Sequence, residues 1–146
     1  MILGNLEDTK KFAREFIENL NQDDNLILLQ GELGAGKTTF SQAILEYLKA
    51  EGPFTSPTFV VMKDYSVNFK NKQGVSFKKV FHIDCYRIDE NSLEDLCWKD
   101  IITDKKNLIL LEWPEKIEKA LPEKYVKINF EVLCENKRSI KIEDKN

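Results

Sequence analysis

Apolar side chains recur at helical intervals near the N-terminus and are followed by a short, continuous apolar run. Phe12, Phe16 and Leu20 are spaced four residues apart, which predicts a helix over residues 7–20. Side chains suited to cap this helix are Asp8 and Thr9. The run Leu-Ile-Leu-Leu at residues 26–29 is typical of a strand buried on both faces. A second helical pattern covers residues 40–48.

The pattern in the middle of the chain predicts strands. Residues 59–66 and 77–84 are rich in Val, Phe and Tyr, and the turn sequence Asn-Lys-Gln-Gly lies between them at residues 71–74. This pattern predicts an antiparallel hairpin. A short helix over residues 93–98, capped by Ser92, is expected to follow.

The last third begins with a second fully apolar run at residues 108–111 and continues with a brief helix over residues 117–121. Residues 125–132 and 139–142 alternate between apolar and polar side chains, which predicts a terminal hairpin. The sequence contains no repeat, linker or low-complexity tract. We therefore predict one α/β domain over residues 1–146, with a mixed central sheet flanked by helices.

Composition narrows the class of protein. The chain has 42% hydrophobic residues and a net charge of −3, and no apolar run approaches the length that spans a bilayer. Lys70, Lys72, Lys78 and Lys79 form the nearest approach to a basic cluster, but they flank a predicted turn. A nucleic-acid-binding domain usually carries a basic stripe. A role in an RNA pathway would therefore go through a protein partner.

The three cysteines indicate a reducing compartment. Cys85, Cys97 and Cys134 lie far apart and lack the spacing of a zinc site or a redox pair. We expect reduced, half-buried thiols. With no basic and apolar leader pattern at the N-terminus, the expected location is the cytoplasm, without a membrane.

The sequence Gly-Glu-Leu-Gly-Ala-Gly-Lys-Thr at residues 31–38 fits the pattern G-x-x-x-x-G-K-[ST] of a phosphate-binding loop, or P-loop. A buried-type strand precedes it and an amphipathic helix follows, as this loop requires. Gly34 and Gly36 allow the backbone N–H groups to turn toward a polyphosphate. Lys37 is expected to reach the β- and γ-phosphates of ATP, and the Thr38 hydroxyl is expected to bind Mg²⁺.

Such a site also needs a carboxylate for the metal. Asp84 and Glu112 each end a strongly apolar strand, so both are candidates. The one histidine, His82, lies mid-strand and is expected to be a structural hydrogen-bonding group. Trp113 could close the sheet edge or shield the site, and Arg87 could neutralise phosphate or contact a partner.

Four segments, taken in order, resemble one family. They are Gly-Glu-Leu-Gly-Ala-Gly-Lys-Thr-Thr-Phe (31–40), Thr-Ser-Pro-Thr-Phe (55–59), His-Ile-Asp-Cys-Tyr-Arg (82–87) and Leu-Glu-Trp-Pro-Glu (111–115). Together they look like the TsaE (YjeE) family of bacterial P-loop ATPases needed to form threonylcarbamoyladenosine (t6A) in tRNA. The family often has Leu-Gly before its next helix, whereas this chain has Leu96-Cys97-Trp98.

The resemblance implies roles for individual residues. Thr38 and Glu112 match the Mg²⁺ ligands, Asp84 matches a Walker B-like acid, and residues 55–59 match a switch loop near the γ-phosphate. Lys37, Asp84 and Glu112 would form the catalytic set. The implied ATP contacts are Thr9, Gly34, Ala35, Gly36, Lys37, Thr38, Thr39 and Arg138.

The resemblance also implies partners. In that family the ATPase acts on the TsaB–TsaD pair, which transfers the threonylcarbamoyl group to adenosine 37 of tRNAs that read codons beginning with adenine. Contact with tRNA would then be indirect.

Three other functions compete. A small-molecule kinase would need an Arg-bearing lid, yet the chain has only Arg14, Arg87 and Arg138 and no long insertion. A GTPase would need a guanine-reading Asn-Lys-x-Asp, which is absent. A nucleotide-binding scaffold without turnover stays open.

Overall fold

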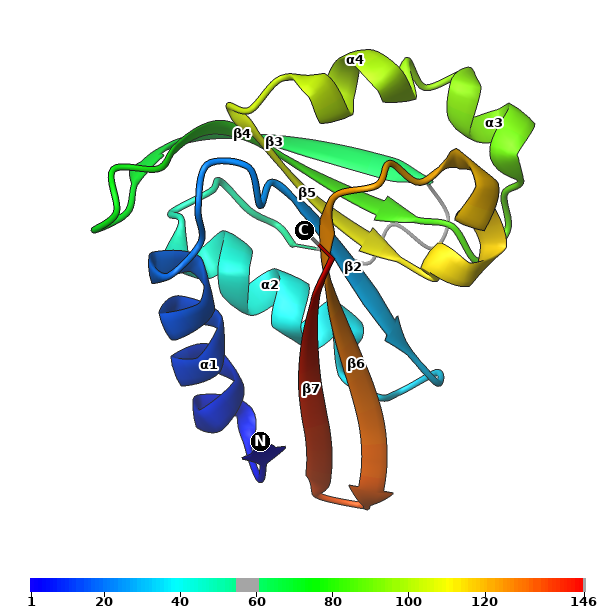
Figure 1. The fold of residues 1–146 in the computed structure, drawn as a ribbon. Helices are drawn as coiled ribbons and strands as arrows, with labels where there is room; N and C mark the ends of the chain where they lie inside the picture. The colour runs from blue at the N-terminus through cyan, green and yellow to red at the C-terminus, as the bar shows by residue number, and fades with distance from the viewer. Residues whose placement is uncertain (55–60, 146) are drawn as a thin grey trace.

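The computed structural model describes residues 1–54 and 61–145, and the seven strands within these ranges form one sheet (Figure 1). Their order across the sheet is β1-β7-β6-β2-β5-β4-β3. The strands are β1 (Ile2–Leu3), β2 (Leu26–Gly31), β3 (Met62–Lys70), β4 (Ser76–Asp84), β5 (Asn107–Glu112), β6 (Tyr125–Cys134) and β7 (Lys137–Lys145).

The sheet is mixed, as predicted. Strands β6, β2, β5 and β4 are parallel to one another, whereas β3, β7 and β1 pair antiparallel with their neighbours. The arrowheads of β2, β4 and β5 point the same way in Figure 1. Their carboxyl ends therefore share one edge of the sheet, where an open α/β sheet usually binds ligands.

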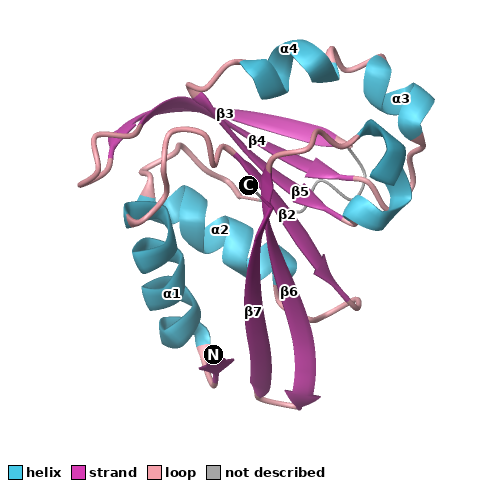
Figure 2. Cartoon of the chain, viewed as in Figure 1, coloured by secondary structure: helices cyan, strands magenta, loops and turns pink. Residues whose placement is uncertain are grey.

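Helices cover both faces of the sheet (Figure 2). Two long helices, α1 (Leu6–Glu18) and α2 (Lys37–Tyr47), pack on one face, while α3 (Glu90–Glu94), α4 (Trp98–Thr103) and the 3₁₀ helix η1 (Pro114–Ala120) pack on the other. The first four residues of β2, positions 26–29, are all apolar because both faces of the strand are covered. Its side chains alternate between the two cores, Ile27 and Leu29 facing one and Leu26 and Leu28 the other.

The predicted hairpins are both present, with longer strands than expected. Strand β3 starts at Met62, so the predicted beginning of this strand at residues 59–60 lies outside the described residues. Asn71 in the turn is buried, and its amide donates to the carbonyl oxygens of Ile17 and Leu20 at 3.0 Å each. The turn is therefore tied to the end of α1 and is not a freely solvated loop.

Two predicted helix caps are wrong. Asn5, not Asp8 or Thr9, caps α1, and its side chain accepts the Asp8 N–H at 2.9 Å. Asp89, not Ser92, caps α3, and its carboxylate accepts the Ser92 N–H at 2.9 Å. Near the start of each helix, more than one polar residue could serve as the cap. Helix α4 and strand β1 are too short to give a periodic signal.

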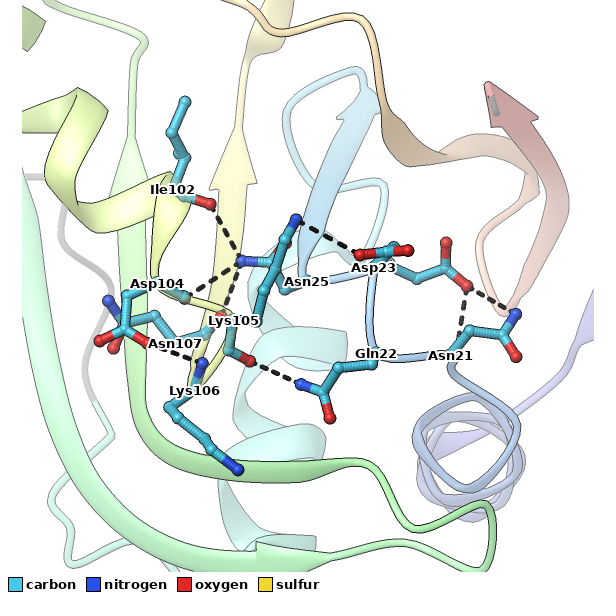
Figure 3. Close-up of polar contacts among 10 residues, drawn as sticks. Asn21, Gln22, Asp23, Asn25, Ile102, Asp104, Lys105, Lys106 and Asn107 are labelled. Carbon is cyan, nitrogen blue, oxygen red and sulfur yellow. Dashed lines mark hydrogen bonds and ion pairs between the residues drawn. The ribbon is translucent and has the colours of Figure 1, made fainter.

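The amino ends of β2 and β5 are held together by the side chain of Asn25 (Figure 3). Its amide donates to the carbonyl oxygens of Asn107 at 3.0 Å and Ile102 at 3.3 Å, and its oxygen accepts the Lys105 ammonium at 3.1 Å. Asn25 is buried, so these partners satisfy an amide that water does not reach. The contacts fix the relative position of the two strands that carry the candidate site at their other ends.

The cysteines are free, as expected, but their burial differs from the prediction. Cys85 is buried, whereas Cys97 and Cys134 are exposed. No helix in the described ranges has both the length and the apolar character needed to cross a membrane.

Cys97 adopts the left-handed conformation, with φ 57° and ψ 40°, at the start of α4. A side chain in this conformation costs roughly 1–2 kcal/mol relative to right-handed backbone, and glycine avoids that cost. Glycine would therefore suit position 97, where the TsaE family often has the glycine of Leu-Gly and this chain has Cys97.

We expect Cys97→Gly to raise the free energy of unfolding by about 0.5–1 kcal/mol, because the relief of strain exceeds the extra entropy of the unfolded glycine. Denaturant unfolding measures this change in free energy, provided that the parent and the variant show the same dependence of the unfolding free energy on denaturant concentration. Cys134→Gly is the control, since Cys134 lies in β6 and glycine weakens a strand by about 0.5–1 kcal/mol. A loss of stability in both variants would contradict this account of Cys97.

Candidate functional site

The loop between β2 and α2 has the backbone conformation that its glycines predicted. Gly34 has φ 78° and Gly36 has φ 104°, both in the left-handed region that glycine favours. Gly36 is the N-cap of α2 and makes no side-chain cap hydrogen bond. The first N–H groups of α2 are therefore left for an external acceptor, and the helix dipole favours an anion there.

The side chain of Lys37 folds back into this loop. Its ammonium donates to the carbonyl oxygens of Gly31 and Glu32, and it lies 4.2 Å from the centre of the Trp113 ring. Burial lowers the pKa of Lys37, while the nearby carboxylates Glu112, Glu115 and Asp84 act in the opposite direction. The Lys37 ammonium therefore lies next to the loop and close to three carboxylates.

Strand register brings the two candidate acids together. Asp84 on β4 pairs with Glu112 on β5, and Glu112 pairs with Leu29 on β2. Residues at paired positions lie on the same face of the sheet. For Glu112 this is the face that α2 covers, and its Oε1 accepts the Thr38 hydroxyl at 3.0 Å. Asp84 accepts the Tyr86 N–H at 2.9 Å.

The acids are sheltered from solvent. Glu112 is 2% exposed and Asp84 is 9% exposed. The other oxygen of Glu112, Oε2, lies 3.1 Å from Nε2 of His82, which is fully buried. Beside Asp84, burial raises the pKa of the Cys85 thiol to about 12, and the neighbouring carboxylates add to this. That thiol stays protonated and is no nucleophile.

Two hollows lie next to the loop and share Gly34, Gly36 and Thr39 in their linings. The strand-edge hollow has a volume of about 400 Å³. It is lined by Leu33, Gly34, Gly36, Lys37, Thr38, Thr39, Asp84, Tyr86, Arg87, Glu112 and Trp113.

The second, hairpin-side hollow has a volume of about 250 Å³ and lies between the loop, the start of α1 and the turn of the β6–β7 hairpin. Thr9, Ala35 and Arg138 line it. One Arg138 nitrogen, Nη2, donates to the Gly34 carbonyl oxygen at 3.3 Å, and the other, Nη1, donates to the Cys134 carbonyl oxygen at 2.8 Å. The guanidinium thereby ties the hairpin to the loop.

Within the described part of the chain, every residue assigned to the site from sequence lies around this loop and its two hollows. The predicted switch segment, residues 55–59, lies outside the described residues. Sequence reasoning missed the contact of His82 with Glu112 and the lining residues Asn5, Phe130 and Asn136. The two-residue alternation of a strand could have placed His82 on the same face as Asp84, but it does not indicate the contact with Glu112.

The donor set suits a nucleotide and a hard cation. A hydroxyl and a carboxylate in contact, Thr38 and Glu112, are oxygen donors of the kind Mg²⁺ prefers. In the described ranges no group of three or more His, Cys, Asp or Glu side chains is placed to hold a metal ion. Mg²⁺ in phosphate-transfer sites characteristically takes one or two carboxylates and completes its shell with phosphate and water.

Comparison with known proteins identifies the family of this chain. The family model described as threonylcarbamoyl adenosine biosynthesis protein TsaE matches residues 3–140. Proteins named tRNA threonylcarbamoyladenosine biosynthesis protein TsaE are similar over nearly the whole chain. The one from Rickettsia felis is 36% identical over 94% of this chain and 75% of its own length. The one from Aquifex aeolicus is 33% identical over 97% and 93%.

A solved structure shares the fold. The crystal structure of YdiB from Bacillus subtilis superimposes with a TM-score of 0.74 over 100% of this chain and 84% of that chain, at 24% identity. The TsaE protein of the same organism is 32% identical over 93% of this chain and 79% of its own length. With the family model covering 138 of 146 residues (positions 3 through 140), this chain belongs to the TsaE family.

Proposed function

We propose that this chain binds and hydrolyses ATP in the pathway that forms t6A at adenosine 37 of tRNAs reading codons that begin with adenine. In this proposal it acts on a TsaB–TsaD complex in the cytoplasm and does not transfer the threonylcarbamoyl group itself. The observation that carries the proposal is the contact of Thr38 with Glu112 beside the glycine loop. The names of the relatives supply the pathway.

The loop and its lysine would bind the phosphates. Backbone N–H groups at the start of α2 donate to no capping side chain, so they are available to phosphate oxygens. Lys37 would exchange the carbonyl oxygens of Gly31 and Glu32 for the β- and γ-phosphate oxygens, a stronger charge-assisted contact. The adenosine would lie in the hairpin-side hollow, near Thr9 and Arg138.

The two acids would bind the metal and orient the attacking water. Thr38 and Glu112 would hold Mg²⁺, which neutralises charge on the transferring phosphoryl group when it is bound. Asp84, paired with Glu112 on the next strand, would orient the attacking water or a metal-bound water. Because both carboxylates are shielded from solvent, their charges act at lower effective dielectric than they would at the surface.

The surface around the strand-edge hollow supports a protein partner. The chain carries a net charge of −3, and the strand-edge hollow is rimmed by exposed apolar side chains, Leu33 at 87% and Tyr86 at 51% exposed. Such a rim suits contact with a protein more than contact with tRNA. A partner that prefers the ATP-bound form would by linkage tighten ATP binding, and hydrolysis would release it.

The small-molecule kinase alternative finds no support, because the family model and the relatives all carry TsaE names. Turnover of ATP is the property that separates an ATPase from a nucleotide-binding scaffold.

Lys37→Ala should weaken ATP binding in the presence of Mg²⁺ about 10–100-fold, since a hydrogen bond to a charged group contributes roughly 1.5–3 kcal/mol. Titration calorimetry measures the affinity. Lys99→Ala, an exposed lysine on α4 outside both hollows, is the control and should bind as the parent does. Equal affinity of Lys37→Ala and the parent would show that the loop is no working phosphate site.

Glu112→Gln and Asp84→Asn should each lower ATP turnover by roughly 10²–10³-fold, because each removes a charge from an electrostatic site while keeping the side-chain shape. The assay measures phosphate release and t6A formed per complex with TsaB and TsaD. We expect slow hydrolysis by the isolated parent, stimulation by the partners, and no multiple-turnover t6A formation with Glu112→Gln.

The control for that assay is Glu123→Gln, an exposed acid between η1 and β6 that should behave as the parent does. If Glu112→Gln supported many rounds of t6A formation at the parent's rate, ATP hydrolysis would not be the step that this protein contributes.

A further inference from the structure

His82 has a buried imidazole in contact with Glu112, and the proposed function gives it no role. It lies in the centre of β4 and is fully buried. Its Nε2 lies 3.1 Å from Oε2 of Glu112, and its Nδ1 has no hydrogen-bond partner among the described residues. A buried, unpaired nitrogen is costly and needs an explanation.

Strand register explains why this histidine meets Glu112. His82 pairs with Leu110 on β5, and Asp84 pairs with Glu112, so His82 is the diagonal neighbour of Glu112 on the same face. His82 therefore contacts Oε2 of Glu112 from β4, while Thr38 contacts Oε1 from α2.

The role of Glu112 as a metal ligand implies a direction for the hydrogen bond. A carboxylate that holds Mg²⁺ is ionised and can only accept, so Nε2 of His82 would carry the hydrogen and donate it to Oε2. A carboxylate with one oxygen held in this way cannot rotate freely about its last bond. Its second oxygen, Oε1, is left facing Thr38 at the mouth of the strand-edge hollow.

We propose that His82 is a positioning residue that ties down Oε2 of Glu112, so that the carboxylate offers one oxygen to the metal. This inference rests on the proposed function, because it takes Glu112 as a metal ligand. Mg²⁺ requires near-ideal octahedral geometry, whereas Ca²⁺ accepts bidentate carboxylates and more ligands. Holding one oxygen back therefore favours Mg²⁺ over Ca²⁺ at this site.

Three substitutions separate the hydrogen bond from simple packing. His82→Gln places an amide nitrogen the same number of bonds from the backbone as Nε2, so it keeps the donor. His82→Asn keeps an amide but is too short, and His82→Met keeps the reach but has no donor. Ile83→Val, on the same strand and buried in the opposite core, is the control for general weakening of β4.

The measurement is binding of a fluorescent, non-hydrolysable ATP analogue as MgCl₂ or CaCl₂ is varied, with thermal unfolding recorded for each variant. His82→Asn and His82→Met should raise the half-saturating Mg²⁺ concentration about 10–100-fold, the usual effect of losing a hydrogen bond to a metal ligand. The half-saturating Ca²⁺ concentration should change less, so the two variants should prefer Mg²⁺ over Ca²⁺ less strongly than the parent does. His82→Gln and Ile83→Val should stay close to the parent, and binding in EDTA should be equal in all.

If a folded His82→Asn or His82→Met variant showed the same Mg²⁺ dependence as the parent, the inference would be overturned and the proposed function would stay intact. An equal loss of Mg²⁺ and Ca²⁺ binding in all three His82 variants would also overturn it, since that result indicates packing alone. A parent protein without Mg²⁺-dependent nucleotide binding would overturn the proposed function and this inference together.

Discussion

The parallel register of β2, β5 and β4 is the constraint on which the site depends. It places Glu112 beside Leu29 on one side and beside Asp84 on the other, all on the face that α2 covers. Because side chains alternate along a strand, a slip of one residue would turn both acids to the opposite face. The loop after β2 would then meet apolar side chains in place of two carboxylates.

Contacts far from the loop maintain this register. Asn25 binds three carbonyl oxygens and the Lys105 ammonium where β2 and β5 begin, at the opposite end of the strands from Thr38 and Glu112. The apolar side chains of β2 and β5 then enter two cores, which resist any shift along the strand. The strands that carry the buried polar groups of the site are therefore held in fixed positions, as a preorganised electrostatic site requires.

The sequence predicted the parts whose signal is local. The unbroken apolar runs, the turn at residues 71–74 and the glycines of the loop each reflect a requirement of a few consecutive residues, and each agrees with the structure. The helix caps were wrong because several polar residues could serve and only tertiary geometry chooses among them. The hydrogen bond of His82 to Glu112 links residues 30 positions apart, so it depends on strand order, which no local pattern carries.

The central claim is that Thr38 and Glu112 hold Mg²⁺ while Lys37 binds the phosphates of ATP. A crystal structure with Mg²⁺ and a non-hydrolysable ATP analogue tests it most directly. We expect the metal bound to the Thr38 hydroxyl and to one oxygen of Glu112, with His82 still on the other oxygen. We also expect the Lys37 ammonium on the phosphates, released from the Gly31 and Glu32 carbonyl oxygens. A metal held by Asp84 without Glu112, or Lys37 still bound to those carbonyl oxygens, would contradict the account.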